Sequence, residues 1–168
     1  MKKKLILTLI FAIAIIALGC EKDNINMTNV DIGSLISYLD STGQDLLDPN
    51  TSNAYNIDDI KVFHYINNEK ILFSRGNLDN SKGFFVSKDL GMEYYMLALA
   101  QVNDYNETGS NYEYETITFL ELRSNETDTI KCLIRLGENS YICRRVHYNS
   151  NLVWAWEDIV PREFIIQK

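Results

Sequence analysis

The feature that most constrains the fold is a set of three strand-like segments late in the sequence, joined by short stretches of turn-forming residues. The segments lie at 129–136, 141–148 and 152–157 and carry Ile, Leu, Val, Tyr and Trp. The stretches between them, 137–140 and 149–151, contain Gly, Asn and Ser, which are common in tight turns. Connections this short join neighbouring strands that run in opposite directions. The sequence therefore predicts an antiparallel meander.

The rest of the sequence after residue 29 divides in a similar way. Strand-like segments at 30–39, 60–66 and 116–122 are separated by stretches rich in Asn, Asp, Gly and Ser. Segment 94–101 contains Met, Leu and Ala, which favour helix, but its length and its neighbours favour a strand. Short strands at regular spacing are typical of a sandwich or barrel. We therefore predict one all-β domain at 30–168, an antiparallel β-sandwich of about eight or nine strands.

A different kind of segment precedes this domain. Lys2, Lys3 and Lys4 form a basic patch, and the apolar run 5–18 that follows is interrupted only by Thr8. Fourteen helical residues extend about 21 Å, which is less than the roughly 30 Å of a bilayer core. A basic start, a short apolar run and small residues at its end are typical of a secretory signal. We predict a signal peptide at 1–19; the alternative is an uncleaved anchor helix.

The end of the apolar run carries a processing motif. The sequence Ala17-Leu18-Gly19-Cys20 resembles the lipobox of bacterial lipoproteins, with Ala17 at the position that is usually Leu. The resemblance implies that Cys20 is lipidated and becomes the first residue of the mature protein. Two or more acyl chains hold a protein stably on a membrane. Residues 20–29 are polar and without periodicity, so we interpret them as the lipidated cysteine and its tether.

The sequence also resembles a set of uncharacterised lipoproteins of the Bacteroidetes. The resemblance rests on the start at Cys20, on the layout Asp-x-x-Gly-x-x-Leu-Leu-Asp-Pro-Asn-Thr at 40–51, and on the closing stretch 128–154. It implies a β-sandwich of immunoglobulin or transthyretin-like kind, and it implies no activity. In that phylum, a short acidic stretch after the cysteine can mark export to the cell surface. Lys22-Asp23 matches such a signal in part, and an ordinary solvated linker is the alternative.

The net charge narrows the classes of partner. The full sequence carries a formal charge of −7. Three of its 16 basic residues lie in the leader, so the mature chain has 13 basic residues against 23 acidic ones, a charge of −10. An acidic protein is unsuited to nucleic acid and to anionic lipid surfaces. The charge suits a neutral or cationic ligand.

Two cysteines are candidates for a disulfide. Cys132 and Cys143 lie on the two arms of one predicted hairpin, and a cell envelope is often oxidising. If Leu136 faces Tyr141, both thiols lie on the same face of the sheet. If the turn is shifted by one residue, they lie on opposite faces. Free buried thiols are the alternative to a disulfide.

Catalytic and metal-binding motifs are not recognisable. His64 and His147 are the only histidines, each within a predicted strand, and neither belongs to a known catalytic pattern. Asp45 and Asp48 stand with other oxygen-bearing side chains in one loop, but their spacing is not that of an EF-hand. Asx turns explain them better. We therefore predict no enzyme, no metal site and no cofactor.

Two tryptophans are candidates for a ligand platform. Trp154 and Trp156 alternate within segment 152–157, so a strand would place both on one face. Aligned aromatic rings can stack against sugars. The alternative is that both rings belong to the core, because aromatic side chains bury large areas.

These observations predict a lipid-anchored protein of the cell envelope, at the outer membrane and either surface-exposed or periplasmic. The leading hypothesis is a non-enzymatic binding module for a protein or a glycan. The alternative is a structural accessory subunit of an outer-membrane complex. A hydrolase is a third hypothesis, without a site to support it.

Overall fold

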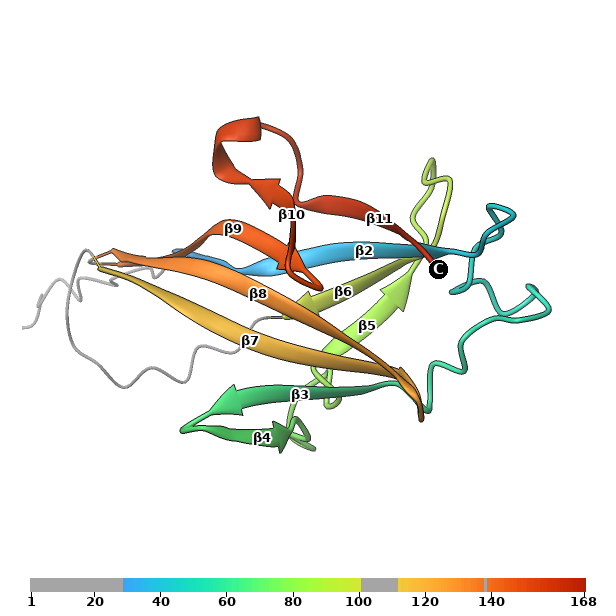
Figure 1. The fold of residues 1–168 in the computed structure, drawn as a ribbon, viewed down its shortest axis with the longest axis horizontal. Helices are drawn as coiled ribbons and strands as arrows, with labels where there is room; N and C mark the ends of the chain where they lie inside the picture. The colour runs from blue at the N-terminus through green and yellow to red at the C-terminus, as the bar shows by residue number, and fades with distance from the viewer. Residues whose placement is uncertain (1–28, 101–111, 138) are drawn as a thin grey trace, which may run out of the picture.

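The computed structural model describes residues 29–100, 112–137 and 139–168, so the predicted signal peptide and Cys20 lie outside the described residues (Figure 1). Regular structure in the described part consists of strands and one short 3-10 helix, η1 (Trp156–Asp158). The strands are β1 (Asn29–Asp31), β2 (Gly33–Leu39), β3 (Lys61–Ile66), β4 (Glu69–Leu72), β5 (Phe84–Ser87), β6 (Met96–Ala100), β7 (Tyr112–Arg123), β8 (Glu126–Gly137), β9 (Ser140–Tyr148), β10 (Asn151–Ala155) and β11 (Glu163–Gln167).

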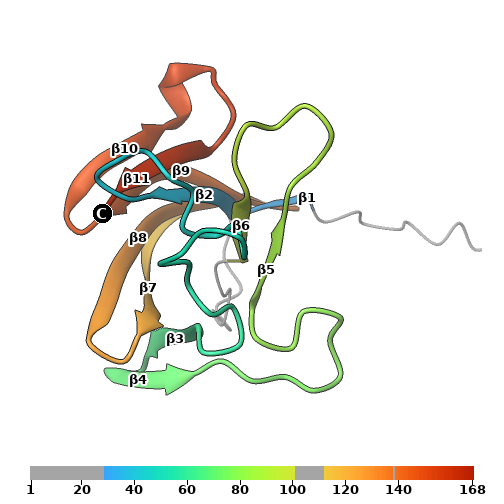
Figure 2. The same ribbon diagram turned by 90° about the vertical axis from the view of Figure 1, so that its right-hand side faces the viewer.

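The strands form two sheets that face each other across the core (Figure 2). The larger sheet has the order β1-β9-β8-β7-β3-β4, and β10 also pairs with β9. The smaller sheet has the order β11-β2-β6-β5. The prediction of an all-β sandwich is confirmed, with more strands than the eight or nine expected. β6 covers residues 96–100 of the predicted segment 94–101, which confirms the interpretation as a strand for these residues, and residue 101 lies outside the described residues.

The prediction of purely antiparallel pairing is wrong for two pairs of strands. β1 pairs with β9 in parallel, and β11 pairs with β2 in parallel. In both cases the chain changes sheets next to the strand concerned: only Ile32 separates β1 from β2, and the stretch after β10 leads into β11. A strand that follows a crossing to the opposite sheet can run parallel to its new neighbour, because no short turn joins the two. The antiparallel direction expected for hairpins therefore does not apply to these strands.

The predicted meander is confirmed as β8, β9 and β10. Asn149 and Ser150 both have positive φ in the β9–β10 turn, as do Asn67 and Asn68 in the β3–β4 turn. Two consecutive residues with positive φ match the twist of the flanking strands in a two-residue hairpin, and Asn tolerates this conformation. The polar turn residues therefore set the strand pairing locally.

The core lies between the two sheets and follows the alternation of the strands. Ile36 and Tyr38 of β2 and Leu97 and Leu99 of β6 are fully buried on the inner face of the smaller sheet. Alternate residues of the larger sheet face them, and Leu46, Leu47 and Tyr55 from the long loop after β2 complete the same cluster. Burial of these side chains supplies the main driving force for folding, at roughly 25 cal/mol per Å² of apolar surface.

Candidate functional site

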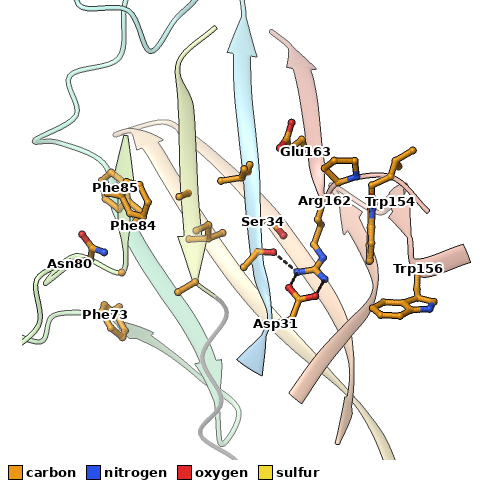
Figure 3. A pocket seen from close by; sticks show the side chains of 18 of the residues that line it. Asp31, Ser34, Phe73, Asn80, Phe84, Phe85, Trp154, Trp156, Arg162 and Glu163 are labelled. Carbon is orange, nitrogen blue, oxygen red and sulfur yellow. Dashed lines mark hydrogen bonds and ion pairs between the residues drawn. The ribbon is translucent and has the colours of Figure 1, made fainter. Parts of the chain in front are cut away.

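A cleft of about 950 Å³ opens where β2 begins and β6 ends (Figure 3). Its walls come from the starts of β2 and β5, the end of β6, part of the loop before β5, and residues of the stretch 154–163. Thirteen of its 21 lining residues are apolar or aromatic. Ligand sites are typically concave, about 300–1,000 Å³ in volume and mostly apolar. The cleft is therefore the best candidate for a functional site in the described residues.

Alternation along the smaller sheet explains the apolar lining. β5 places Phe84 in the core and Phe85 on the outer face, where it is exposed. Phe85 stands beside Ala98 of β6, and Ala98 stands beside Leu35 of β2. All four residues line the cleft. A short row of apolar side chains across three strands thus forms part of its surface.

The two tryptophans line this cleft, but they form neither the ligand platform nor the jointly buried pair that the sequence leaves open as alternatives. The pairing of β10 with β9 shifts between Leu152 and Trp154, and β10 ends at Ala155. Trp156 begins η1, and the Asp158 carboxylate accepts a hydrogen bond from the Ala155 amide at the start of this helix, at 2.9 Å. Trp154 is 6% exposed and Trp156 is 43% exposed. The expectation of two rings on one strand face is therefore wrong, and the rings do not share a plane (Figure 3).

Trp154 and Arg162 lie on one side of the cleft and are held in place by several contacts. The Trp154 indole donates a hydrogen bond to the Val160 carbonyl oxygen at 3.0 Å. The Arg162 guanidinium stacks on the Trp154 ring at 4.5 Å and binds both carboxylate oxygens of Asp31, at 3.0 and 3.2 Å. It also donates to the Gly33 carbonyl oxygen. These contacts join the stretch before β11 to the start of β2.

Sequence reasoning did not identify Arg162 or Asp31. The two residues are 131 positions apart, and neither belongs to a recognisable motif. The only local signal is Pro161, which marks the stretch before the last strand without indicating a partner for its neighbour. The pair becomes visible only when β11 lies beside β2.

Cys132 and Cys143 are both buried and both free in the structure. Leu136 pairs with Tyr141 and Ile134 with Cys143, so the first of the two predicted registers is present and the thiols lie on the same face. A hydrogen bond between the two thiols raises the pKa of Cys132, to which burial adds, and lowers the pKa of Cys143. The thiols do not line the cleft.

The other polar residues singled out from the sequence lie away from the cleft. His64 is buried, with its Nδ1 atom 3.1 Å from the Thr118 hydroxyl, and His147 is on β9. Asp45 accepts a hydrogen bond from the Leu47 amide at 2.9 Å. Asp48 accepts one from the Asn50 amide at the same distance. The interpretation of this loop as Asx turns is therefore confirmed.

A second polar cluster occupies another part of the sandwich. Asp128 of β8 is buried and accepts hydrogen bonds from Tyr148 and Asn149. Lys168 lies 2.7 Å from the Asp128 carboxylate and 2.9 Å from that of Glu126. Asp128 and Glu126 thus both have protein partners, so the cluster has the character of a structural network.

The described ranges 29–100, 112–137 and 139–168 contain no group of three or more His, Cys, Asp or Glu side chains placed to hold a metal ion. In those same ranges no helix has the length and apolar character needed to cross a bilayer. Comparison with protein-family models, with curated proteins and with solved structures finds no match for this chain.

Proposed function

We propose that this protein is a non-enzymatic binding module of the bacterial cell envelope, anchored by a lipid on Cys20, and that its cleft binds an apolar segment of a protein. The observation that carries the proposal is the cleft of about 950 Å³ with its largely apolar lining. Exposed apolar patches rimmed by polar residues mark interaction sites. Phe85 and Trp156 are large exposed side chains at such a patch.

The chemistry of the lining favours a binding role over a catalytic one. The described lining residues include no histidine, cysteine or lysine. The buried guanidinium of Arg162 is held by Asp31, Gly33 and Trp154. Asp31, Asp79 and Glu163 are the lining residues that could exchange a proton with a substrate, and Asp31 is held in an ion pair with Arg162. The apolar majority of the lining favours recognition over turnover.

A protein segment suits the cleft better than a glycan. Sugar sites need many hydrogen-bonding groups beside an aromatic ring, whereas six of the 21 lining residues carry polar or charged side chains. Trp154 is buried with Arg162 stacked on it, which leaves Trp156 as the exposed indole. A single exposed ring is a weaker sugar platform than an aligned pair of rings.

A peptide titration tests the binding proposal. The full-length lipidated protein, held in nanodiscs, is titrated with a short capped peptide of alternating leucine and glutamine, and binding is followed by calorimetry. We expect saturable binding that Phe85→Asp weakens about tenfold or more, because a charge in a desolvated apolar contact is costly. Tyr65→Asp is the matched control, since Tyr65 is an exposed aromatic residue on the other sheet.

The outcomes of this titration are distinct. Equal affinity in the parent protein and in both variants would show that the peptide binds elsewhere. Binding of soluble oligosaccharides without binding of the peptide would make the cleft a glycan site and the proposal wrong.

The anchor has its own test. Cys20→Ala should abolish incorporation of a palmitate label and leave an unprocessed precursor. A variant that still takes up the label would contradict lipidation at this residue. Protease shaving of intact cells, with lysed cells as the control, then distinguishes a surface domain from a periplasmic one.

The alternative function is that of a structural accessory subunit. It is favoured by the exposed apolar side chains of Ile159 and Val160, which line the cleft, and of Ile165 on β11, because such a surface would suit a permanent partner. This alternative predicts a stable stoichiometric complex in a mild detergent extract. A monomeric extract would exclude it.

A further inference from the structure

The positive charge of the cleft is less accessible to solvent than its negative charges. Arg162 is the only cationic residue among the described residues that line it, and its side chain is 7% exposed. Its guanidinium group is already bound to Asp31 and Gly33 and stacked on Trp154. A ligand in the cleft therefore meets little of the positive charge.

The carboxylates of the cleft, by contrast, are open to a ligand. The side chain of Asp31 is 53% exposed although it pairs with Arg162. Asp79 and Glu163 are exposed and also line the cleft. Figure 3 shows Asn80, the neighbour of Asp79, and Glu163 on opposite sides of the cleft. With Arg162 counted, the formal charge of the described lining is −2.

The exposed aromatic ring at this site also contacts a cation. The guanidinium of Arg144 lies over the Trp156 ring at 5.1 Å, and Arg144 is 3.6 Å from the Glu157 carboxylate. Arg144 does not line the cleft. An indole attracts cations through the negative charge of its face, and Arg144 already lies over this ring. The selectivity of the cleft for cations therefore rests on the carboxylates, and Trp156 offers a ligand apolar contact.

We infer that the cleft is selective for a cationic peptide segment, in which apolar side chains fill the cleft and Lys or Arg side chains reach Asp31, Asp79 and Glu163. The inference rests on the proposed function, which supplies the apolar contact. Clefts lined by charge of one sign with apolar walls focus the electric field and attract ligands of the opposite sign. Phosphate-bearing lipids and acidic peptides are disfavoured for the same reason.

The test compares three capped peptides that alternate leucine with lysine, with glutamine or with glutamate. The full-length protein in nanodiscs of zwitterionic lipid is titrated with each peptide at low and at high salt. We expect the lysine peptide to bind about tenfold more tightly than the glutamine peptide, because several exposed ion pairs each contribute a small factor. The glutamate peptide should bind most weakly, and high salt should reduce the differences.

Variants locate the effect. Asp79→Lys combined with Glu163→Lys should reverse the order of affinity of the lysine and glutamate peptides. Glu115→Lys is the matched control, because Glu115 is an exposed carboxylate of β7 that does not line the cleft. It changes the net charge without changing the charge of the cleft.

The two proposals fail in different ways. If no peptide binds, or if Phe85→Asp leaves the affinity of every peptide unchanged, the proposed function is wrong. If the glutamine peptide binds through Phe85 but the lysine peptide gains nothing over it, the binding module stands and the charge selectivity is overturned. The charge selectivity is also overturned if the double variant and Glu115→Lys change the peptide affinities equally.

Discussion

The two ends of β11 make the same kind of contact with opposite consequences. Arg162 precedes the strand and pairs with Asp31 of β1, whereas Lys168 follows it and pairs with Asp128 of β8. In each case a cation beside the smaller sheet reaches a carboxylate of the larger sheet. Asp128 is buried with further partners, but Asp31 is half exposed at the cleft. The buried Asp128 therefore serves the stability of the fold, whereas the exposed Asp31 carboxylate is accessible to a ligand.

The largest expected effect is on the buried pair. Asp128→Ala removes the acceptor for Tyr148, Asn149 and Lys168. We expect a loss of about 3–5 kcal/mol in the free energy of unfolding, because breaking a buried pair leaves uncompensated polar groups. Urea denaturation measures it, with Asp79→Ala as an exposed control. A loss similar to that of the control would show that the two ends do not differ.

High pH should weaken the same end of the molecule. Burial is the main factor that raises the pKa of Tyr38, Tyr55 and Tyr148 above the ordinary value of 10.0. Above about pH 10 the unfolded tyrosines ionise while the folded ones keep their protons, so the unfolded state binds fewer protons. Stability is then full below pH 10 and falls as the pH rises, by about 1.4 kcal/mol per pH unit for each tyrosine.

Thermal unfolding between about pH 8 and pH 11 checks this prediction. Tyr148→Phe should reduce the slope above pH 10, because one buried titrating group is lost. The control is Tyr65→Phe, which removes the same hydroxyl group from an exposed side chain. If the dependence of stability on pH is the same in Tyr148→Phe as in the parent protein, the loss of stability at high pH does not arise from Tyr148.

An intermediate effect is expected at the cleft. Arg162→Ala removes the ion pair with Asp31, the hydrogen bond to Gly33 and the stacking on Trp154. We expect a loss of about 2–3 kcal/mol, since charged hydrogen bonds and a cation–π contact are lost. Asp31→Asn should cost less than Arg162→Ala, about 1–2 kcal/mol, because Asn keeps an acceptor for the guanidinium although the buried Arg162 loses its partner charge. A larger cost for Asp31→Asn than for Asp128→Ala would invert the comparison of the two ends.

The smallest effect on stability is expected at Trp156. Trp156 is 43% exposed and is the first residue of the short 3-10 helix η1. Trp156→Ala should change the free energy of unfolding by less than about 0.5 kcal/mol, as is usual for surface sites. It should nevertheless weaken binding of the glutamine and lysine peptides severalfold, because an apolar contact with the ligand is lost. Equal losses of stability and of binding would indicate that Trp156 supports the fold instead.

Much of the fold could be predicted because its causes are local. The Asn149 turn adopts positive φ and joins two strands of the meander as expected. The alternation in β6 places Leu97 and Leu99 in the core. The candidate site could be predicted only in part. Trp154 and Trp156 do line it, but the shift in β10 separates their environments, and no local pattern indicates that shift.

The sequence by itself determined the strands, the hairpin turns, the acidic charge and the expectation of a lipid anchor, because each depends on residues close together along the chain. The tertiary structure decided the parallel pairs, the cleft and the contacts at the two ends of β11. Arg162 meets Asp31 across 131 positions, and Lys168 meets Asp128 across 40. Such contacts depend on which strands become neighbours, and a periodic pattern specifies which face of a strand is buried without specifying its neighbour.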